Sequence, residues 1–445
     1  MKYPVRCDGS FLAIMLFFCL IVLSVGCQEE KDGCTDPSAA NFDPEATNDN
    51  GNCELSVPSA YVFTRGQNST VDNALAVSRQ LMIQDLRLNI QALGMPNATP
   101  VSETDLLAYY LTDPENDSIS ILSPVGNDLI ATDTVYSGLG VTIGLSGAIS
   151  PLFGTDTETR TRLAEIAANS QTALLGTPEV YTTPDGLDLS AYLPALLTGA
   201  VLIHQVTDSI IASLDTLDNI SFGNSGGTAV EHAIDQLMGY AGTARYYREF
   251  SLEDLSNEVQ PTGEVPFAKD RDGNGSLDYA SEYNFSFARW AAARELTSGA
   301  PNFTDDLFDA LLLARAAAEV GDEEAATRQV AIMEYQMAME EILAATVIHH
   351  LNNVIGHMGT LGTSAYAQAD HNADWAHMYG YLTCFRFFTG TRLTQVESLL
   401  NSTGENPIYD LPGTGTHEDY LTQLGSIRTQ IKNTMGFSDE AAGGF

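Results

Sequence analysis

Apolar residues recur at three- and four-residue spacing along most of the chain beyond residue 60. This period is the signature of amphipathic helices that bury one face against a core. The pattern predicts helices over residues 73–93, 158–175, 188–213, 227–250, 280–297, 304–319, 322–358, 372–389 and 417–434. Residues 118–150 are rich in Ser, Thr and Gly with short β-branched runs, so they predict a loop or a small hairpin. Helices of these lengths favour antiparallel packing, and we therefore predict an all-α, multi-helix bundle.

An almost unbroken apolar run, Phe11–Val25, follows two basic residues near the start of the chain. A run of roughly 15 residues is short for a membrane span, which takes roughly 20, and is typical of a signal peptide. Gly26 stands directly before Cys27, and lipoprotein signal peptidase cleaves between a small residue and a cysteine. We therefore predict that residues 1–26 are removed and that lipid on Cys27 anchors the chain to a membrane. The alternative is an ordinary secretory signal with an incidental cysteine.

The chain is strongly acidic, with 58 Asp and Glu residues against 20 Lys and Arg residues and a net charge of −38. Nucleic acids and anionic lipid surfaces are normally bound by basic patches, so this charge argues against nucleic acid as a partner. It favours cations as partners, although adaptation to a salty environment explains it equally well. The acidic stretch Gln28–Asp32 resembles the surface-export signal of Bacteroidota lipoproteins, which implies an outer membrane lipoprotein exposed at the cell surface.

Two cysteines flank a short segment behind the predicted lipid anchor. Cys34 and Cys53 can form a disulfide in an oxidising compartment, whereas Cys384 lies in an apolar helical stretch and is expected to be a buried thiol. The flanked segment resembles short cysteine-bracketed repeats of secreted Bacteroidota proteins, and its Asp and Asn residues suit either a calcium ion or tight turns. We assign residues 27–57 to a lipidated, disulfide-closed acidic spacer.

The most specific short motif of the chain resembles the EF-hand calcium loop. Calcium needs six to eight oxygen ligands, and the loop spacing wraps them around one ion, with a glycine at the sharp turn, here Gly275. The ligands would come from Asp270, Asp272, Asn274, Ser276, Asp278 and Glu282. Ser281 occupies the position of the expected bidentate carboxylate, which follows one residue later, and Pro261 and Pro266 argue against an entering helix. We predict a structural calcium site with only an exit helix, and the alternative is a tight turn without an ion.

A histidine and an aspartate lie three residues apart in the predicted helix 227–250, which places them on one helix face. His232 and Asp235 resemble the imelysin motif, glycine-x-His-x-x-Glu, but Val230 replaces the glycine and Asp replaces Glu. Imelysin-like proteins are envelope-exposed, all-α proteins of two bundle-like halves, implicated in iron uptake and also named as peptidases. The resemblance implies a transition-metal site for iron or zinc, which His350 and His357, seven residues apart, can complete. The alternative is a His–Asp hydrogen bond within a helical core.

Three segments together resemble one uncharacterised Bacteroidota lipoprotein family, the domain of unknown function 4856. They are Tyr61–Arg65, the helix from His232 to Gly242, and the loop from Asp270 to Glu282. The resemblance covers roughly the helical domain, which we place at residues 58–435, and it implies a surface lipoprotein of helical fold without an established activity. Residues 436–445 are expected to form a flexible C-terminal tail.

These observations leave three hypotheses for function. The first is a non-enzymatic surface lipoprotein with a calcium-stabilised loop that binds a metal ion or a metal-bearing ligand. The second is an imelysin-like metallopeptidase, which needs a third metal ligand and an open coordination position near His232. No H-E-x-x-H motif supports it. The third is a structural or adhesion module, which would expose an apolar patch and lack a polar cleft.

Overall fold

The computed structural model describes residues 30–35, 39–111, 119–126, 129–139 and 144–445. The chain divides into two compact units at residue 57. The predicted signal peptide and the predicted lipid-bearing Cys27 lie outside the described residues.

The first unit is a small, disulfide-closed segment. Cys34 and Cys53 form a disulfide across a Cα–Cα distance of 4.9 Å. Two short strands, β1 (Asp32–Gly33) and β2 (Asn48–Asp49), pair in parallel beside it. The Asp43 carboxylate accepts a hydrogen bond from the backbone N–H two residues ahead, which is the Asx-turn geometry of a turn former.

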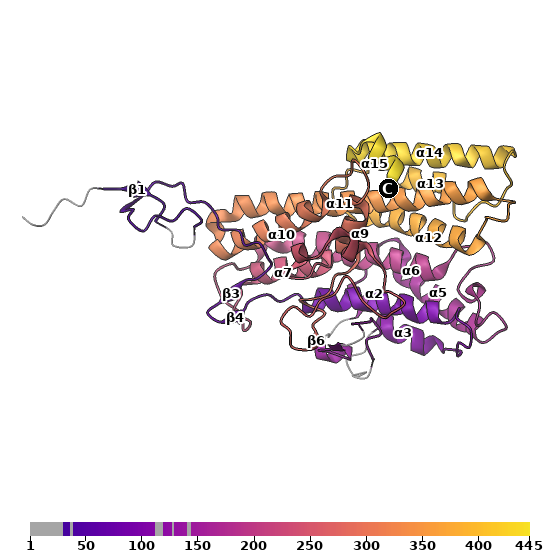
Figure 1. Ribbon diagram of the computed structural model, residues 1–445, viewed down its shortest axis with the longest axis horizontal. Helices are drawn as coiled ribbons and strands as arrows, with labels where there is room; N and C mark the ends of the chain where they lie inside the picture. The colour runs from indigo at the N-terminus through magenta and orange to yellow at the C-terminus, as the bar shows by residue number, and fades with distance from the viewer. Residues whose placement is uncertain (1–29, 36–38, 112–118, 127–128, 140–143) are drawn as a thin grey trace, which may run out of the picture. The chain divides into compact units, whose positions relative to one another are not determined.

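The second unit is built almost entirely of α-helices, which confirms the all-α, multi-helix prediction (Figure 1). Its α-helices are α2 (Ala74–Ala92), α3 (Glu103–Leu111), α4 (Leu145–Ala148), α5 (Thr155–Ser170), α6 (Leu189–Leu197), α7 (Ala229–Ala241), α8 (Leu252–Ser256), α9 (Ser286–Glu295), α10 (Phe303–Val320), α11 (Ala325–Thr360), α12 (Gln368–Cys384), α13 (Val396–Thr403), α14 (Gly415–Met435) and α15 (Asp439–Gly444). Its strands are β3 (Thr64–Arg65), β4 (Asn68–Ser69), β5 (Ile130–Ala131) and β6 (Ser276–Leu277).

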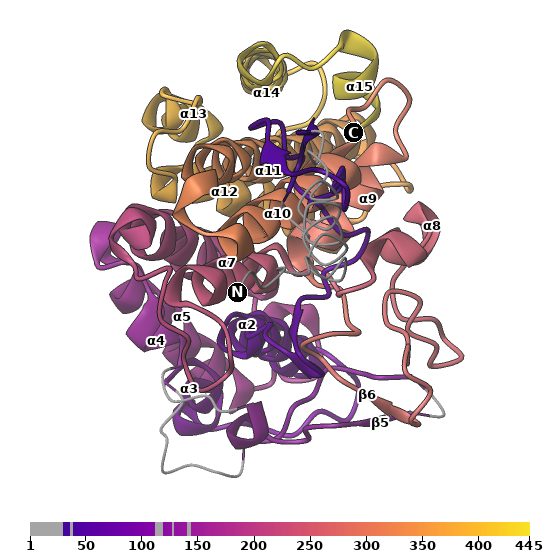
Figure 2. The ribbon, with the colours of Figure 1, turned by 90° about the vertical axis from the view of Figure 1, so that its left-hand side faces the viewer.

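The long helices stack in layers around α11. Helix α11 packs between α10 and α12, with α9 and α14 against its sides, and α12 packs in turn on α6. Helix α2 contacts α3, α6 and α7, so it joins the N-terminal helices to the rest of the core. Figure 2 shows α13, α14 and α15 on one side of α11 and α12, and the α2 to α5 region on the other side. The core therefore lies mainly between α11 and the two helices packed on it, α10 and α12.

Helix α7 is much shorter than the helix predicted over 227–250. Thr228 caps its start, because its side chain accepts a hydrogen bond from the Glu231 backbone N–H while the Glu231 side chain bonds back. The helix ends at Gly242, which has a φ of +76° and lies so close to Phe285 that an added Cβ would be 2.8 Å from the Phe285 Cβ. The prediction was wrong at this end because the close packing of a distant segment terminates the helix.

The helix that begins at Leu189 continues in helical form to Thr216, but not as a regular α-helix. Pro194 lies inside α6 and has no N–H to donate, and the segments Thr198–Ile203 and Gln205–Ile210 are π-helical. Within the described residues, this stretch is long and apolar enough to cross a membrane, and 61% of its most apolar window is buried inside the protein. Its apolar character matches its place in the core against α12 and α2.

The Ser-, Thr- and Gly-rich region 118–150 is tied to the predicted calcium loop. Strand β5 pairs in parallel with β6, so Ile130 lies opposite Ser276 and Ala131 opposite Leu277. Ser120 and Val135 also form an isolated antiparallel bridge. The calcium loop is therefore held by a segment more than a hundred residues away along the chain.

The C-terminal residues do not form the flexible tail that was expected. Residues Asp439–Gly444 form α15, and Phe445 is 3% exposed. The Phe445 ring lies 5.2 Å from the Phe437 ring and 6.0 Å from the Phe303 ring of α10. The expectation was wrong because the two C-terminal phenylalanines bury their rings against another helix, which offsets the entropy of ordering the chain end.

Candidate functional site

The loop from Asp270 to Glu282 folds so that three of its carboxylates face one another. Oxygen atoms of Asp270, Asp272 and Glu282 lie within 4.8 Å of one another. Glu282 is buried, and its Oε1 accepts hydrogen bonds from the backbone N–H groups of Arg271 at 2.7 Å and Asp272 at 3.3 Å. The displacement of this carboxylate by one position in the sequence therefore still leaves it inside the loop.

The loop backbone donates hydrogen bonds to the acidic side chains of the loop. Asp270 accepts one from Gly275 N at 2.8 Å and one from Gly273 N at 2.8 Å, and these bonds lower the pKa of Asp270. Both glycines have positive φ angles, +71° at Gly273 and +83° at Gly275, which favour glycine over other residues. Asn274 accepts a hydrogen bond from Ser276 N at 2.7 Å. The loop is thus held in a curled shape by its own backbone.

One predicted calcium ligand, Asp278, makes other hydrogen bonds instead. Asp278 accepts hydrogen bonds from Ala280 N at 2.9 Å and from the Ser281 hydroxyl at 2.6 Å, and it is not part of the three-carboxylate group. The helix predicted from residue 280 begins at Ser286 instead. The exit helix therefore starts after the loop has closed rather than within it.

The Asp235 carboxylate of the imelysin-like pair faces a buried arginine. Arg315 of α10 donates from Nε to Asp235 Oδ1 at 3.0 Å and from Nη2 to Glu231 Oε2 at 3.1 Å. The Tyr61 hydroxyl donates to the same Asp235 oxygen at 3.0 Å. None of these four side chains is more than 1% exposed. Asp235 is therefore neutralised and hydrogen-bonded by protein groups inside the core.

His232 lies at the edge of this network. Its Nδ1 is 3.5 Å from Asp235 Oδ2 and its Nε2 is 2.7 Å from the Ser225 hydroxyl. The neighbouring Asp235 carboxylate raises the pKa of His232. The Nε2 is hydrogen-bonded, whereas the buried Nδ1 faces Asp235 without making a hydrogen bond.

The two histidines proposed to complete a metal site lie in a different group. His350 Nδ1 is 2.8 Å from Asp374 Oδ1, and His357 Nε2 is 2.8 Å from Asp374 Oδ2. Among the described His, Cys, Asp and Glu side chains, the three-carboxylate group of the calcium loop is the one that gathers three ligand atoms within 4.8 Å. The structure therefore does not bring His232 and Asp235 into one ligand group with His350 and His357.

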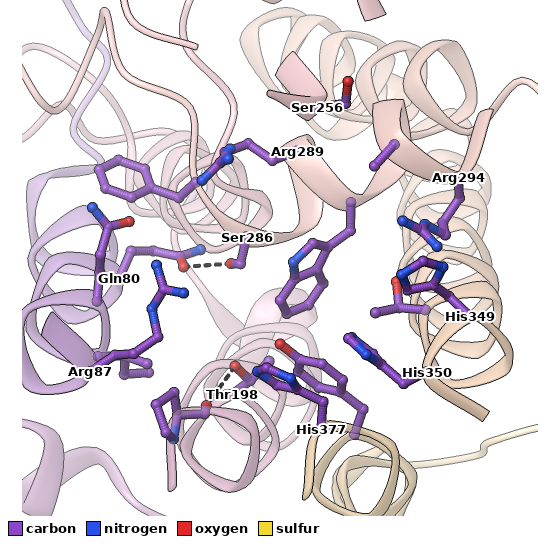
Figure 3. Close-up of a pocket in the computed structure, with 18 of the residues that line it drawn as sticks. Gln80, Arg87, Thr198, Ser256, Ser286, Arg289, Arg294, His349, His350 and His377 are labelled. Carbon is purple, nitrogen blue, oxygen red and sulfur yellow. Dashed lines mark hydrogen bonds between the residues drawn. The ribbon is translucent and has the colours of Figure 1, made fainter. Parts of the chain in front are cut away.

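A cavity of about 280 Å³ lies where α2, α6, α9, α11 and α12 meet, and we call it the Arg/His cavity. Its charged and titratable lining comprises Arg87, Arg289, Arg294, His349, His350 and His377, together with the exposed Glu258 at its rim. Figure 3 shows Arg294 beside His349 on one wall and Gln80 with Arg87 on the opposite wall. Pro194 and Thr198 also line it, so the change from α- to π-helix occurs at its wall.

The three cavity arginines differ in their partners. Arg289 is satisfied, because it donates to the backbone carbonyls of Leu255 and Asn257 and to Glu258 Oε1 at 3.2 Å. The side chains of Arg87 and Arg294 make no hydrogen bond or ion pair with any described residue, and the Arg294 Nε is buried without a partner. Burial lowers the pKa of Arg294 to about 10. Two guanidinium groups therefore border the cavity without an ion-pair partner in the described part of the chain.

The cavity histidines His349, His350 and His377 are neutral in this arrangement. Burial, together with the positive charge of Arg294, lowers the pKa of His349 to about 3. Burial also lowers the pKa of His350 and lowers that of His377 well below its usual range. Burial alone would raise the pKa of Asp374, but the hydrogen bonds from His350 and His357 have the larger effect, so its pKa lies below the usual range. The His350 Nδ1 is thus engaged by an ionised carboxylate, and its other nitrogen has no described hydrogen-bond partner.

The sequence analysis missed this cavity. Only His350 of its lining was singled out there, and for a different role. The arginines lie on helices far apart along the chain, and a single arginine in an amphipathic pattern carries no sign that it lacks a partner.

The comparisons with known proteins add no relative. No protein-family model matches the chain, and neither the curated proteins nor the solved structures contain a match.

Proposed function

We propose that the helical domain is a non-enzymatic binding domain that takes a small ligand in the Arg/His cavity. The observation that carries the proposal is the cavity itself, which combines a volume of about 280 Å³ with two guanidinium groups, Arg87 on α2 and Arg294 on α9, that have no partner among the described residues. Small-molecule sites are typically concave, lie between elements, and carry a few convergent polar groups. Native interiors rarely leave buried polar atoms without partners, so the buried Arg294 Nε argues for a ligand.

We do not place the ligand at His232, although the resemblance to the imelysin motif implies a metal there. The Asp235 carboxylate is already paired with Arg315, and a metal ion would have to displace that guanidinium. Breaking a buried ion pair is costly, because it leaves an uncompensated charge inside the protein. A metallopeptidase would need an open coordination position, and the hydrogen bonds around Asp235 leave no support for one.

The proposal is tested by native mass spectrometry of the full chain extracted from its own membrane. We expect a small molecule that stays bound to the folded protein and is released when it unfolds. Ala293 lines the cavity, so Ala293→Trp should fill it and abolish binding without changing the circular dichroism spectrum. If wild type holds no ligand, or if Ala293→Trp holds the same ligand as wild type, the binding function is wrong.

We also propose that the Asp270–Glu282 loop holds a structural calcium ion. The supporting observation is the group of three carboxylates within 4.8 Å, since hard oxygen donors are what calcium prefers. Like charges at this separation repel, and a divalent cation removes the repulsion. The ion would be held by Asp270, Asp272 and Glu282, and it would stabilise the attachment of the loop to β5.

Calorimetric titration of metal-free full-length protein tests the calcium proposal. We expect binding of one Ca²⁺ per chain, weakened at least about tenfold in Asp272→Asn, because one carboxylate ligand is lost. Asp254→Asn, an exposed aspartate outside the loop, is the matched control and should bind as wild type does. Equal Ca²⁺ binding by Asp272→Asn and wild type would contradict the proposal, as would no binding by either.

We further propose that lipid on Cys27 tethers this domain to the outer membrane at the cell surface. The support is the apolar run that ends at a small residue before Cys27, with acidic residues behind it. Metabolic labelling with a fatty acid should tag wild type and not Cys27→Ala. Surface exposure is checked by whether added protease digests the domain on intact cells.

A further inference from the structure

We infer that the ligand of the Arg/His cavity is a small organic anion, an aromatic carboxylate or phosphate monoester. This inference rests on the proposed binding function and names the chemical class of the ligand.

The cavity carries an unbalanced positive charge. The whole chain carries a net charge of −38, yet two arginines with no ion-pair partner among the described residues border this one space. Glu258 is the one acidic residue of the lining, and it is exposed and already bonded to Arg289. An anion would therefore balance the positive charge of the cavity. An arginine also presents paired N–H donors that fit a carboxylate or a phosphate.

The cavity also holds hydrogen-bond donors without partners among the described residues. Gln80 and Gln84 line it, but their amide N–H groups already donate to other protein groups, so the free guanidinium donors are those of Arg87 and Arg294. A neutral imidazole donates one hydrogen bond; His350 gives its own to Asp374, whereas the His377 ring has no described hydrogen-bond partner and can donate to an anion. The cavity thus offers donors on opposite walls, as Figure 3 shows for Arg87 and Arg294.

The same arrangement argues against a metal cation. His349, His350 and His377 do not gather with any described acid or cysteine into a group of three ligand atoms within 4.8 Å. The Nδ1 of His350 already faces Asp374. A cation in the cavity would also meet the unbalanced charge of Arg294, whose pKa burial lowers to about 10.

We expect the rest of the ligand to be a flat ring. Aromatic side chains form a continuous wall: the His350 and His377 rings stack at 4.7 Å, His377 and Tyr381 stack at 5.7 Å, and Tyr381 meets Trp290 at 4.9 Å. Aromatic rings prefer offset-stacked or edge-to-face neighbours. A planar ring that carries the anionic group can lie on this wall while its charge reaches an arginine.

Calorimetry of the full chain with four probes tests the inference. The probes are benzoate, phenyl phosphate, inorganic phosphate and benzamide, and benzamide is the neutral analogue of benzoate. We expect benzoate or phenyl phosphate to bind at least about tenfold more tightly than benzamide, with an affinity that falls as salt is added. Inorganic phosphate carries the charge without the ring, so it separates the affinity due to the charged group from the affinity due to the ring. If inorganic phosphate competes with phenyl phosphate, most of the affinity comes from the charged group.

Variants at one arginine complete the test. Arg294→Gln should weaken binding of the anionic probes at least about tenfold, and Arg294→Lys should restore only part of it, because the charge remains but the paired N–H donors are lost. Arg386→Gln removes an arginine that is paired with Glu397 outside the cavity, and it should bind as wild type does. Thermal melting of each variant separates lost binding from lost folding.

The outcomes distinguish this inference from the proposed function. Equal binding of benzamide and benzoate, or unchanged binding in Arg294→Gln, overturns the anion while a ligand-binding cavity stands. No binding of any anionic probe, combined with a neutral molecule found in native mass spectrometry, also overturns the anion alone. If native mass spectrometry finds no bound molecule and no probe binds, both the anion and the binding function are overturned.

Discussion

Replacement of Arg315 by methionine should destabilise the helical domain strongly. Arg315 is fully buried and pairs with Asp235 at 3.0 Å and with Glu231 at 3.1 Å. Methionine has a similar length and no charge, so the substitution leaves the buried Asp235 carboxylate without its cation and leaves Glu231 with Arg65 alone. Breaking a buried pair in this way costs about 3–5 kcal/mol, because the remaining charge is uncompensated. We expect a loss of at least that size in the free energy of unfolding.

The same carboxylate offers a matched control. Arg65 also pairs with Glu231, at 3.2 Å, but its side chain is 34% exposed and the pair is screened by water. Arg65→Gln should therefore cost no more than about 1 kcal/mol, which is the usual range for exposed ion pairs. The two arginines share Glu231 as a partner and differ in burial, and Arg65 also donates to the Gly226 carbonyl whereas Arg315 also pairs with Asp235.

Urea unfolding followed by circular dichroism measures both variants. The midpoint should shift while the slope of the transition stays constant, since the surface exposed on unfolding is unchanged. The triple variant Arg315→Met, Asp235→Asn, Glu231→Gln should recover much of the lost stability, because it removes all three buried charges together. The reasoning is refuted if Arg315→Met loses no more stability than Arg65→Gln.

Two further predictions concern helix packing and pH. Gly199→Ala should lower the free energy of unfolding by about 1–3 kcal/mol, since the added Cβ would lie 2.7 Å from the Cys384 Cα. Gly356→Ala, which has open space around it, should raise the free energy of unfolding by up to about 1 kcal/mol. Thermal melting that finds Gly199→Ala more stable than Gly356→Ala would contradict this packing. The cavity histidines have lowered pKa values in the folded protein, so acidification protonates them first in the unfolded chain and lowers stability below about pH 6.5. Between pH 7.5 and 5.5, wild type should therefore lose about 1.4 kcal/mol more than His377→Gln, and parallel pH profiles of the two would refute this.

Local patterns in the sequence predicted the main helices well. The helices at 73–93 and 304–319 appear at Ala74–Ala92 and Phe303–Val320, because a regular apolar stripe depends only on residues within one or two turns. Short helices such as α3 (Glu103–Leu111) and α13 (Val396–Thr403) were missed, since two turns carry too few apolar positions to show a period. Ends were misplaced where a distant segment sets them, as Phe285 does at Gly242.

For the candidate sites too, the sequence predicted the local features and missed the contacts between distant segments. The spacing of the carboxylates in the Asp270–Glu282 loop is a local property, and the sequence alone was enough to bring attention to it. That Glu282 turns into the loop while Asp278 turns away depends on hydrogen bonds of the folded backbone. The pairing of Asp235 with Arg315, eighty residues later, is a tertiary contact that helical spacing does not encode.

By itself, the sequence determined the helical class, the acidic charge and the positions of the loop and the disulfide-forming cysteines. These follow from composition and from short-range spacing, which act through neighbouring residues. Only the tertiary structure decided that Asp235 is bound by a buried arginine and that arginines and histidines from separate helices enclose one cavity. Which side chains lack partners is a property of packing between distant segments, so it becomes visible only when every neighbour of Arg87 and Arg294 is known.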